Sequence, residues 1–263
     1  MEKTDVAFVV LTYRNYTDLE EFIKSLNKVD FRFKVVVVDA YFDDECSKQI
    51  IEVTKKYHFD YIQIPNKGYS FGNNKGIEYV INHYDFEYIV VSNPDTCVEK
   101  FEYEMISGIK EAVIGGSIHN LNNKLQNPMY YKKVLFAQQC IYRGLKRNNK
   151  TLFYTGIVIN KYINKIIGVF NRRNKVFQLH GSFVIFPKAV ITKLGKVYDE
   201  NMFLFAEESY LALKLEELGI ESIYNKNISI LHKQDGSMKF RNDINEQLKV
   251  ANIYVFEKYY RFN

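Results

Sequence analysis

Several features are scarce or missing in this sequence of 263 residues. Its three cysteines, Cys46, Cys97 and Cys140, include no Cys-x-x-Cys pair, so we expect free thiols and neither a disulfide framework nor a zinc site. No run of about 18 apolar residues occurs, so we expect no membrane-spanning helix. The opening "MEKTDVAF" mixes charges of both signs with a short apolar run and differs from a signal peptide, which predicts a cytoplasmic protein.

Acidic residues are absent from one long stretch of the chain. Residues 112–198 contain 15 Lys or Arg and no Asp or Glu, so all 31 acidic residues lie outside this stretch. The formal net charge of +5 therefore combines a strongly basic middle with an acidic remainder. Charge separated in this way usually faces a partner of the opposite sign.

The composition is otherwise that of a folded globular protein, with 47% apolar and 25% charged residues. Continuous apolar runs at 6–12 and 34–39 are typical of strands buried on both faces. The helix predicted between them begins at a capping box formed by Thr17 and Glu20. We expect further helices near 44–57 and 73–84, and strands at 60–64, 87–92 and 112–118. Short links between alternating strands and helices predict right-handed crossovers and a mostly parallel α/β sheet.

Polar residues stand at the predicted carboxyl ends of these strands. Thr12 and Tyr13 follow the first strand, Asp39 ends the second, and "NPD" at 93–95 follows the fourth. The carboxyl ends of parallel strands share one edge of the sheet, where ligands bind. No Gly-x-Gly-x-x-Gly follows the first strand, which excludes the dinucleotide-binding fingerprint. A single acid after a strand can instead belong to a turn or to the start of a helix. We expect the acids at 43–44 to lie in the first turn of the following helix, where they suit the helix dipole.

The segment after the third predicted strand, "NKGYSFGNNKGI" at 66–77, is rich in glycine and asparagine. Glycines such as Gly68 let the backbone approach a ligand closely. The amides of Asn73 and Asn74 can both donate and accept hydrogen bonds. The segment is therefore a further candidate for ligand binding at this edge of the sheet.

The segments "LTYRN", "VVVVDAYFDD", "NKGYSFGNNKGI" and "VVSNPDT", in this order, resemble the family 2 glycosyltransferases of the GT-A fold. The similarity is closest to the rhamnosyltransferase-like branch from bacterial polysaccharide gene clusters. Residues 181–220 resemble that branch through a small-residue strand, a Gly-x-(Phe/Tyr)-Asp-Glu turn and an acidic pair that opens a helix. Residues 231–237 resemble its closing His-x-x-x-Gly-Ser segment. The resemblance covers about residues 6–118 and 180–237.

This resemblance implies a GT-A (Rossmann-like) fold, with a mostly parallel sheet flanked by helices and a C-terminal helical extension. Residues 1–118 would form the nucleotide-sugar-binding half, and 119–237 the acceptor-binding half of the same domain, with a basic insertion at 119–179. Residues 238–263 would form the helical tail. The nucleotide sugar would contact Thr12, Tyr13, Asp39, Gly68, Asn73, Asn74, Asn93 and Asp95.

The resemblance also implies a divalent cation, Mg²⁺ or Mn²⁺, at the diphosphate of the donor. Asp95 stands where the family has the metal-binding aspartate of its Asp-x-Asp element, whereas Asn93 replaces the first aspartate. His232 would be a second metal ligand, or else a strand-end histidine with a structural hydrogen bond. One carboxylate holds a cation less tightly than two, so the sequence leaves the need for metal open.

The family's general base is an acid at the start of a late helix, where this sequence has Glu207 and Glu208. An inverting transfer needs one carboxylate to take the proton of the acceptor hydroxyl. Neighbouring helical residues point about 100° apart, so only one of the two can face the acceptor. Glu208 matches the family's aspartate and is the first candidate, with Glu207 the second. Two acids at a helix N-terminus also suit the helix dipole, and Tyr210 replaces the family's next acid.

The basic insertion at 119–179 mixes Lys and Arg with aromatic and aliphatic residues, notably at 129–147 and 160–177. Such a mixture suits an anionic lipid surface, and the alternative is a solvated basic face. Single-stranded nucleic acid would also fit the pattern, but nothing else in the sequence supports it.

The sequence therefore favours an inverting glycosyltransferase that moves rhamnose or a hexose from a dTDP- or UDP-linked donor. Its acceptor would be a growing bacterial surface polysaccharide on a lipid carrier. The enzyme would then be cytoplasmic or peripheral at the inner face of the cell membrane. The alternative is an inactive protein of the same fold that binds a sugar nucleotide or a glycan.

Overall fold

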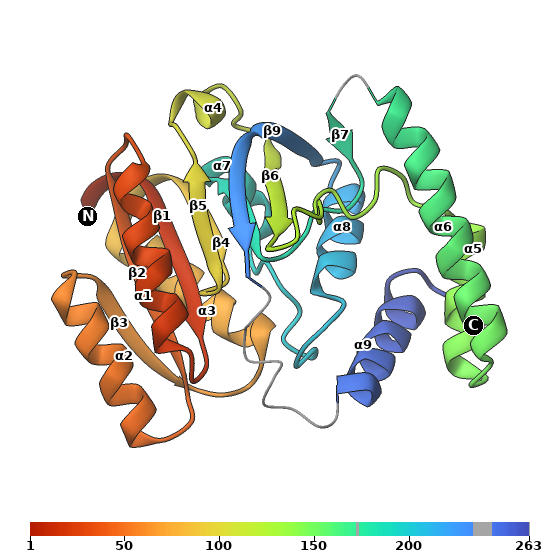
Figure 1. Cartoon of the computed structure of the whole chain (residues 1–263), viewed down its shortest axis with the longest axis horizontal. Coiled ribbons are helices and arrows are strands. Elements are labelled where there is room, and N and C mark those ends of the chain that lie inside the picture. The colour runs from red at the N-terminus through yellow and green to blue at the C-terminus, as the bar shows by residue number, and fades with distance from the viewer. Residues whose placement is uncertain (172–173, 234–243, 263) are drawn as a thin grey trace.

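The computed structural model describes residues 1–171, 174–233 and 244–262. Residues 234–237 of the closing His-x-x-x-Gly-Ser segment, and the first residues of the predicted tail, lie outside the described residues. The described chain is built on a nine-stranded sheet with helices on both faces, as Figure 1 shows. The N-terminus lies beside the parallel strands, and the C-terminus lies at the opposite end of the molecule.

Four parallel strands form one side of the sheet, in the order β3 (Asp60–Pro65), β2 (Phe33–Tyr41), β1 (Glu2–Thr12) and β4 (Tyr84–Ser92). The antiparallel strand β8 (Phe183–Pro187) lies between β4 and β6 (Ala112–Asn120). β6 is parallel to β9 (Glu221–His232), while β5 (Thr96–Lys100) and β7 (Lys175–Val176) pair antiparallel with β9. Six of the nine described strands run the same way, which confirms the prediction of a mostly parallel sheet.

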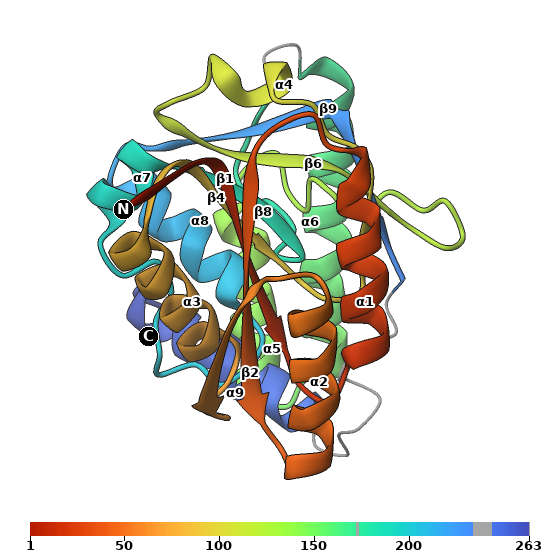
Figure 2. The same ribbon diagram turned by 90° about the vertical axis from the view of Figure 1, so that its left-hand side faces the viewer.

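Helices cover both faces of the sheet, which Figure 2 shows nearly edge-on. One face carries α1 (Tyr16–Ser25) and α2 (Asp44–Lys56), and the other carries α3 (Tyr69–His83), α7 (Lys188–Leu194) and α8 (Glu207–Glu217). Successive side chains of a strand point to opposite faces, so Val9 packs in the α3 layer while Phe8 and Val10 pack in the α1 layer. The continuous apolar runs are thus strands buried on both faces, as predicted. A turn of 3₁₀ helix (Leu26–Lys28) and the short α4 (Glu104–Ser107) complete this part.

Two helices begin earlier than the sequence predicts. α1 starts at Tyr16, and its cap is Asn15, whose side chain accepts a hydrogen bond from Asp18 N at 3.3 Å. The expected capping box at Thr17 is therefore wrong by two residues. α3 starts at Tyr69 and not near residue 73, because the N–H of Tyr69 donates to Phe203 O at 2.8 Å, a partner far away in the sequence.

The basic insertion contains an antiparallel hairpin of two helices, α5 (Leu135–Lys146) and α6 (Lys150–Phe170), at the edge of the molecule. The tail forms α9 (Ile244–Lys258), which packs on α5 with the ring centroids of Tyr142 and Phe256 5.9 Å apart. The predicted C-terminal helical extension is therefore confirmed. Within the described ranges, no helix is both long enough and apolar enough to cross a membrane.

Candidate active site

The structure has the predicted sheet edge at which several strands end in polar residues. Pairing of β1 with β2 sets Thr12 beside Asp39, and pairing of β1 with β4 sets Val10 beside Ser92. The N–H of Asn93 donates to Ser182 O at 2.9 Å, which brings the turn before β8 to the same edge. The ends of these strands therefore meet around the residues matched to the nucleotide-sugar site.

Asp39 is held firmly at this edge, with 1% of its surface exposed. Its Oδ2 accepts hydrogen bonds from Ser47 Oγ at 2.6 Å and from Tyr61 Oη at 2.7 Å. Burial and the bond to Asp39 raise the pKa of Tyr61 to about 12, so the phenol keeps its proton and donates. The next acid, Asp43, caps α2 by accepting from Cys46 N at 2.8 Å, which confirms that the acids at 43–44 open the helix.

An aromatic corner follows β1 and β2. Tyr13 packs edge-on against Phe42 with ring centroids 5.7 Å apart, and the guanidinium carbon of Arg14 lies 3.9 Å from the Phe42 centroid. Phe42 is 40% exposed and can offer a flat apolar surface to a ligand ring. Thr12 is buried, and its hydroxyl donates to Asn15 O at 3.2 Å. The aromatic surface at this corner therefore comes from Tyr13 and Phe42, and the sequence patterns did not indicate Phe42.

The segment rich in glycine and asparagine lies mostly inside α3 and not in a loop. Asn73 and Asn74 are buried, and Asn74 donates to Tyr198 O at 2.9 Å and accepts from Tyr198 N at 3.0 Å. Gly68 has a φ of 97°, and a Cβ there would overlap Phe203 O. Asn74 and Gly68 therefore join the two halves of the chain behind the edge, whereas Asn73 donates to Tyr69 O within α3. Direct contact of their side chains with a sugar nucleotide stays a prediction.

Asp95 and His232 face each other where β5 pairs with β9. Asp95 Oδ2 and His232 Nε2 are 3.4 Å apart, and the side chains are only 5% and 10% exposed. The other ring nitrogen of His232, Nδ1, lies 3.0 Å from Gln126 Oε1. With Nδ1–H donating to this oxygen, Nε2 turns its lone pair toward the carboxylate of Asp95.

Two electron-pair donors that face each other in this way suit a shared cation or proton. A carboxylate oxygen suits Mg²⁺ or Mn²⁺, and a neutral imidazole fixed by a hydrogen bond from its far side is a common metal ligand. The described residues contain no group of three or more His, Cys, Asp or Glu side chains able to hold a metal ion. Asp95 and His232 therefore fit as two ligands of a divalent cation, and water and diphosphate oxygens would have to supply the others.

His180 lies against this pair, although it was not among the predicted site residues. Its ring centroid is 5.3 Å from that of His232, and its Nδ1 is 3.0 Å from Ser182 Oγ. Burial and the neighbouring His232 lower the pKa of His180 to about 4, so its ring is neutral at neutral pH. In the sequence, its position just before the strand at 183–187 could have marked it as a candidate site residue.

Glu208 lies in the first turn of α8, against the turn before β8. Its Oε1 accepts from Gly181 N at 3.4 Å, and a Cβ at Gly181 would lie 3.0 Å from the same oxygen. Tyr69 holds this turn by donating to Gly181 O at 2.9 Å. Burial raises the pKa of Glu208, and the Gly181 N–H lowers it in part. A carboxylate with a raised pKa is suited to accept a proton near neutral pH.

Glu207 is 5% exposed, and its Oε1 has no hydrogen-bond partner among the described residues. A cavity of about 10 Å³, room for about one water molecule, lies between Tyr69, Tyr198 and the two glutamates. Burial and the neighbouring Glu208 raise the pKa of Glu207 to about 8, so it is largely protonated at neutral pH. Neighbouring acids in different environments usually divide the acid and base roles. The assignment of Glu208 as the base and Glu207 as the alternative stays a prediction.

Tyr210, at the position of the family's next acid, is a packing residue. Its ring centroid lies 4.8 Å from that of Tyr259, in the tail after α9. Asp199, in the turn before α8, accepts a hydrogen bond from Tyr254 of α9 at 2.7 Å. Tyr210, which replaces the acid of the family, therefore helps to join α8 to the tail.

No protein-family model matches the chain, and no curated protein is similar to it in sequence. Solved structures match it over nearly its whole length. TarS from S. aureus is 17% identical over 96% of the chain, with a TM-score of 0.54. The mannosyltransferase PcManGT from Pyrobaculum calidifontis, solved with GDP-Man and Mn²⁺, is 14% identical over 100% of the chain, with a TM-score of 0.57. GalNAc-T7, solved with UDP, GalNAc and Mn²⁺, is 11% identical over 98% of the chain, with a TM-score of 0.64.

The chain has the fold of the GT-A glycosyltransferases. It spans 40% of the TarS chain, 66% of the mannosyltransferase chain and 49% of the GalNAc-T7 chain. At these sequence identities the likeness shows the fold alone. The rhamnosyltransferase-like branch and the roles of the individual site residues stay predictions.

Proposed function

We propose that the chain is an inverting glycosyltransferase that moves a sugar from a nucleoside-diphosphate donor to an acceptor hydroxyl. The observation that carries this proposal is the arrangement of two unlike groups at one edge of a GT-A sheet. Asp95 and His232 face each other at 3.4 Å, and Glu208 opens α8 opposite the turn before β8. The turn before β8 links the two groups, because the ring centroids of His180 and His232 are 5.3 Å apart and Gly181 N donates to Glu208 Oε1.

In the proposed reaction, the acceptor oxygen bonds to the anomeric carbon while the bond from that carbon to the diphosphate breaks. Glu208 takes the proton of the acceptor hydroxyl. Asp95 and His232 would hold a divalent cation, and the chemistry this cation would supply is neutralisation of charge on the leaving diphosphate. Glu207 keeps its own proton at neutral pH and does not compete as a base.

The donor nucleotide would lie across the ends of β1 and β2. Tyr13 and Phe42 offer aromatic surface to its base, and the oriented carboxylate of Asp39 lies beside them. Two structures of the same fold were solved with GDP-Man or UDP together with Mn²⁺, which supports a nucleoside diphosphate and a divalent cation here. We infer a dTDP- or UDP-linked donor carrying rhamnose or a hexose from the sequence resemblance.

The proposed acceptor is a growing bacterial surface polysaccharide on a lipid carrier, at the cytoplasmic face of the cell membrane. Support for it comes from the rhamnosyltransferase-like motifs and from the basic insertion at 119–179. A second candidate function is binding of a sugar nucleotide without turnover. It is favoured by Asn93 and Tyr210, which stand where the family has acids.

Thermal unfolding with UDP, dTDP, GDP and CMP, each with and without Mg²⁺ or Mn²⁺, tests donor binding. A ligand at about a hundred times its dissociation constant adds about 2.7 kcal/mol of stability, which raises the Tm of a domain of this size by about 5–10 °C. We expect one nucleoside diphosphate to give this shift and to require the metal. The absence of a shift with all four nucleotides would contradict the proposal.

The Glu208→Gln variant tests the base. Glutamine keeps the shape of the side chain but takes up no proton, so transfer should fall by about 100-fold or more while the nucleotide-induced rise in Tm remains. Glu207→Gln is the matched comparison and should lose less activity. A larger loss in Glu207→Gln would reverse the assignment of the base. A nucleotide-induced shift in a wild-type protein with no turnover would favour the binding protein.

A further inference from the structure

Helix α6 leaves eight of its large apolar residues exposed, while its buried residues are only glycine and asparagine. Its buried residues are Gly156, Asn160 and Asn164. Its exposed large apolar residues are Tyr154, Ile157, Val158, Tyr162, Ile163, Ile166, Val169 and Phe170. A helix on the surface of a soluble domain normally has the opposite arrangement, with its apolar side against the core. The outward face of α6 is therefore suited to an apolar environment.

Specific contacts on the inner face fix the orientation of α6. Asn164 Oδ1 accepts hydrogen bonds from Tyr131 N at 2.7 Å and from Lys132 N at 2.8 Å. Gly156 lies so close to α5 that a Cβ there would be 2.7 Å from Ala137 O. A rotation of the helix that buried its apolar face would break both bonds and this close approach. The fold itself therefore holds the apolar face outward.

The outward residues form a continuous line. Residues four positions apart are neighbours on a helix and differ by about 40° around its axis, because about 3.6 residues make one turn, so a series of them winds slowly along the helix. The apolar stripe, as it is named from here on, consists of Tyr154, Val158, Tyr162, Ile166 and Phe170. All five are exposed, Phe170 to 77%. A contiguous exposed surface of this kind marks an interaction site.

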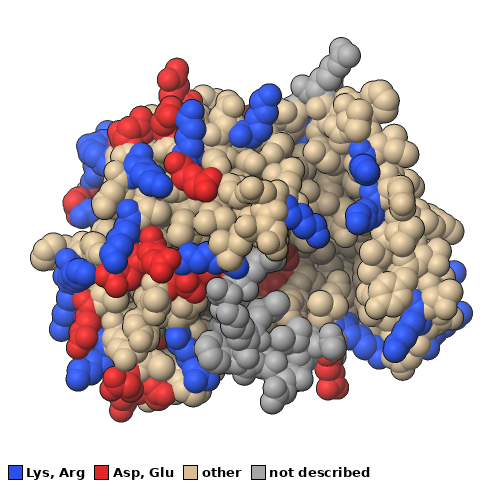
Figure 3. Space-filling view, in the orientation of Figure 1, with Lys and Arg blue, Asp and Glu red and all other residues tan. Residues whose placement is uncertain are grey.

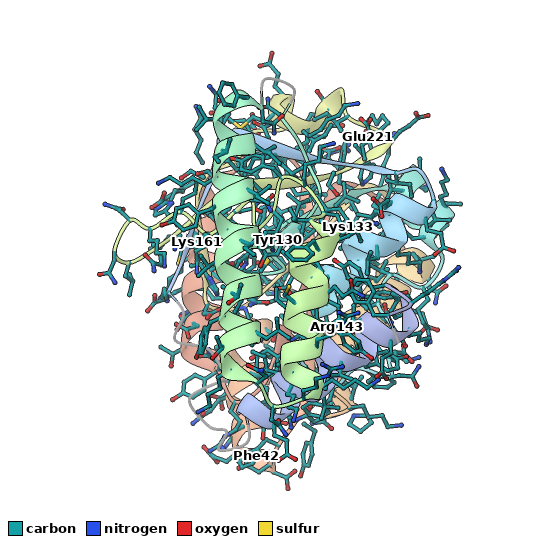
Figure 4. All side chains as sticks on the ribbon, turned by 90° about the vertical axis from the view of Figure 1, so that its right-hand side faces the viewer. Phe42, Tyr130, Lys133, Arg143, Lys161 and Glu221 are labelled. Atoms are coloured by element: carbon teal, nitrogen blue, oxygen red, sulfur yellow. The ribbon has the colours of Figure 1, made fainter. Side chains whose placement is uncertain are left out.

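The charge around the apolar stripe has one sign. Lys161 and Lys165 are exposed on α6 next to Tyr162 and Ile166, and residues 112–198 contain no acid. In Figure 3 the right-hand edge of the molecule, over α5 and α6, shows basic side chains and no acidic ones. Figure 4 looks onto this side of the molecule, with Lys161 on α6 and Arg143 on α5. Lysines beside an apolar stripe are typical of a helix that lies in the surface of an anionic membrane.

We propose that the apolar stripe of α6 lies in the interface of an anionic lipid membrane, with Lys161 and Lys165 at the level of the phosphate headgroups. The aliphatic and aromatic side chains then leave water, and the ammonium groups meet lipid phosphates. The inference rests on the proposed function for its setting, a lipid-linked acceptor. The surface itself lies outside the candidate active site.

A second copy of this chain is the other occupant to consider. Two copies that met through the same face would bring Lys161 and Lys165 of one copy toward those of the other. No acid between residues 112 and 198 would offset this repulsion. An anionic membrane is complementary to both the apolar and the basic parts of the face. Charge therefore favours the membrane over a second copy.

The segment that anchors α6 also reaches the candidate site. Tyr131 donates its N–H to Asn164 of α6, and the preceding Tyr130 exchanges two backbone hydrogen bonds with Gln178, two residues before His180. A membrane bound along α6 would therefore lie on the side of the molecule that carries the proposed base. This placement suits an acceptor that is carried by the membrane.

Co-sedimentation of the full chain with lipid vesicles tests the inference. The vesicles are phosphatidylcholine with phosphatidylglycerol, or phosphatidylcholine alone, each at low and at moderate salt. We expect binding to the anionic vesicles, about tenfold or more weaker binding to the neutral ones, and weaker binding as the salt rises. The absence of binding to anionic vesicles would overturn the inference.

Paired variants locate the surface. Tyr162→Gln with Ile166→Gln, and separately Lys161→Gln with Lys165→Gln, should each weaken binding to anionic vesicles by about tenfold or more. The control Ile81→Gln with Lys48→Gln removes one exposed apolar and one exposed basic side chain elsewhere, and should bind as the wild type does.

Two results with these variants would overturn the inference. One is unchanged vesicle binding in the variant of the apolar stripe. The other is a wild-type dimer in analytical ultracentrifugation that the same variant dissolves, which would assign the face to a second copy. The nucleotide-induced rise in Tm should be equal in all these variants. A failure of lipid binding is therefore distinguishable from a failure of the proposed function.

Discussion

The edge of the sheet and helix α6 depart from ordinary protein packing in opposite directions. At the edge, the acidic residues Asp39, Asp95 and Glu207 each have 5% or less of their surface exposed. On α6, Phe170 is 77% exposed while Asn164 is buried. Buried carboxylates and exposed apolar side chains both cost stability. Departures of this kind are expected where a protein binds something else.

The two regions differ in which groups offset this loss of stability. At the edge these groups lie within the protein, because Tyr61 donates to Asp39 and His232 faces Asp95. Glu207 avoids the cost of a buried charge by keeping its proton. The apolar stripe of α6 is exposed to solvent in the part of the chain that the structure describes. Its compensation has to come from a partner.

The largest effect is expected from Asp95→Asn, which tests whether buried charge at the edge serves the reaction. Asparagine has the same shape without the charge, so turnover should fall by about 100-fold or more. Any dependence of nucleotide binding on Mg²⁺ or Mn²⁺ should disappear with it. Initial rates, and nucleotide titrations with and without metal, measure the two effects.

The control for this variant is Asp44→Asn, which changes an exposed acid in the first turn of α2 and should behave as the wild type. If Asp95→Asn kept full metal dependence, Asp95 would have no part in a cation site. The buried charge at the edge would then need another explanation. Burial of Asp95 would no longer indicate a binding function, as exposure of the apolar stripe does for α6.

A smaller effect, on stability, is expected from Asn164→Ala on the inner face of α6. The substitution leaves the N–H groups of Tyr131 and Lys132 without their acceptor, which should lower the free energy of unfolding by about 1–3 kcal/mol. Val169→Ser, on the exposed side of the same helix, should change it by less than about 0.5 kcal/mol. Urea unfolding of both variants measures the difference. Equal losses would mean that the outward face belongs to the core.

The strands and their polar ends can be predicted from the sequence because both follow from local patterns. Apolar runs lead directly to Thr12 and Asp39, and parallel strands end at one edge of their sheet. Helix starts are less predictable. Thr17 and Glu20 match a capping box, yet Asn15 caps α1, because Arg14 already turns the chain with a φ of 61°.

The contacts of the candidate site join segments that are far apart in the sequence, so no local pattern contains them. His180 meets His232 because β8 and β9 belong to the same sheet. Helix α6 shows the same limit more strongly. Its glycine and asparagine residues would be assigned to solvent on a helical wheel, but the backbone of Tyr131 binds Asn164 and turns that side inward.

The smallest effect is expected from Tyr69→Phe, which tests the geometry of the edge itself. Tyr69 donates to Gly181 O at 2.9 Å, and the N–H of Gly181 lies 3.4 Å from Glu208 Oε1. Without the hydroxyl, the turn at Gly181 is held less firmly and its bond to Glu208 weakens. The kcat should fall about tenfold with the donor KM unchanged.

The pH dependence of kcat separates this positioning role from a general loss of structure. The N–H of Gly181 lowers the pKa of Glu208, so a weaker bond lets burial raise that pKa further. Because the base must be ionised to work, the acidic limb of kcat should move to higher pH in Tyr69→Phe. Tyr79→Phe, further along α3, is the control and should leave both kcat and its acidic limb unchanged. A fall in kcat with an unmoved acidic limb would mean that Tyr69 supports the fold and not the base, and a limb that moved to lower pH would show that Glu208 is not the group that titrates.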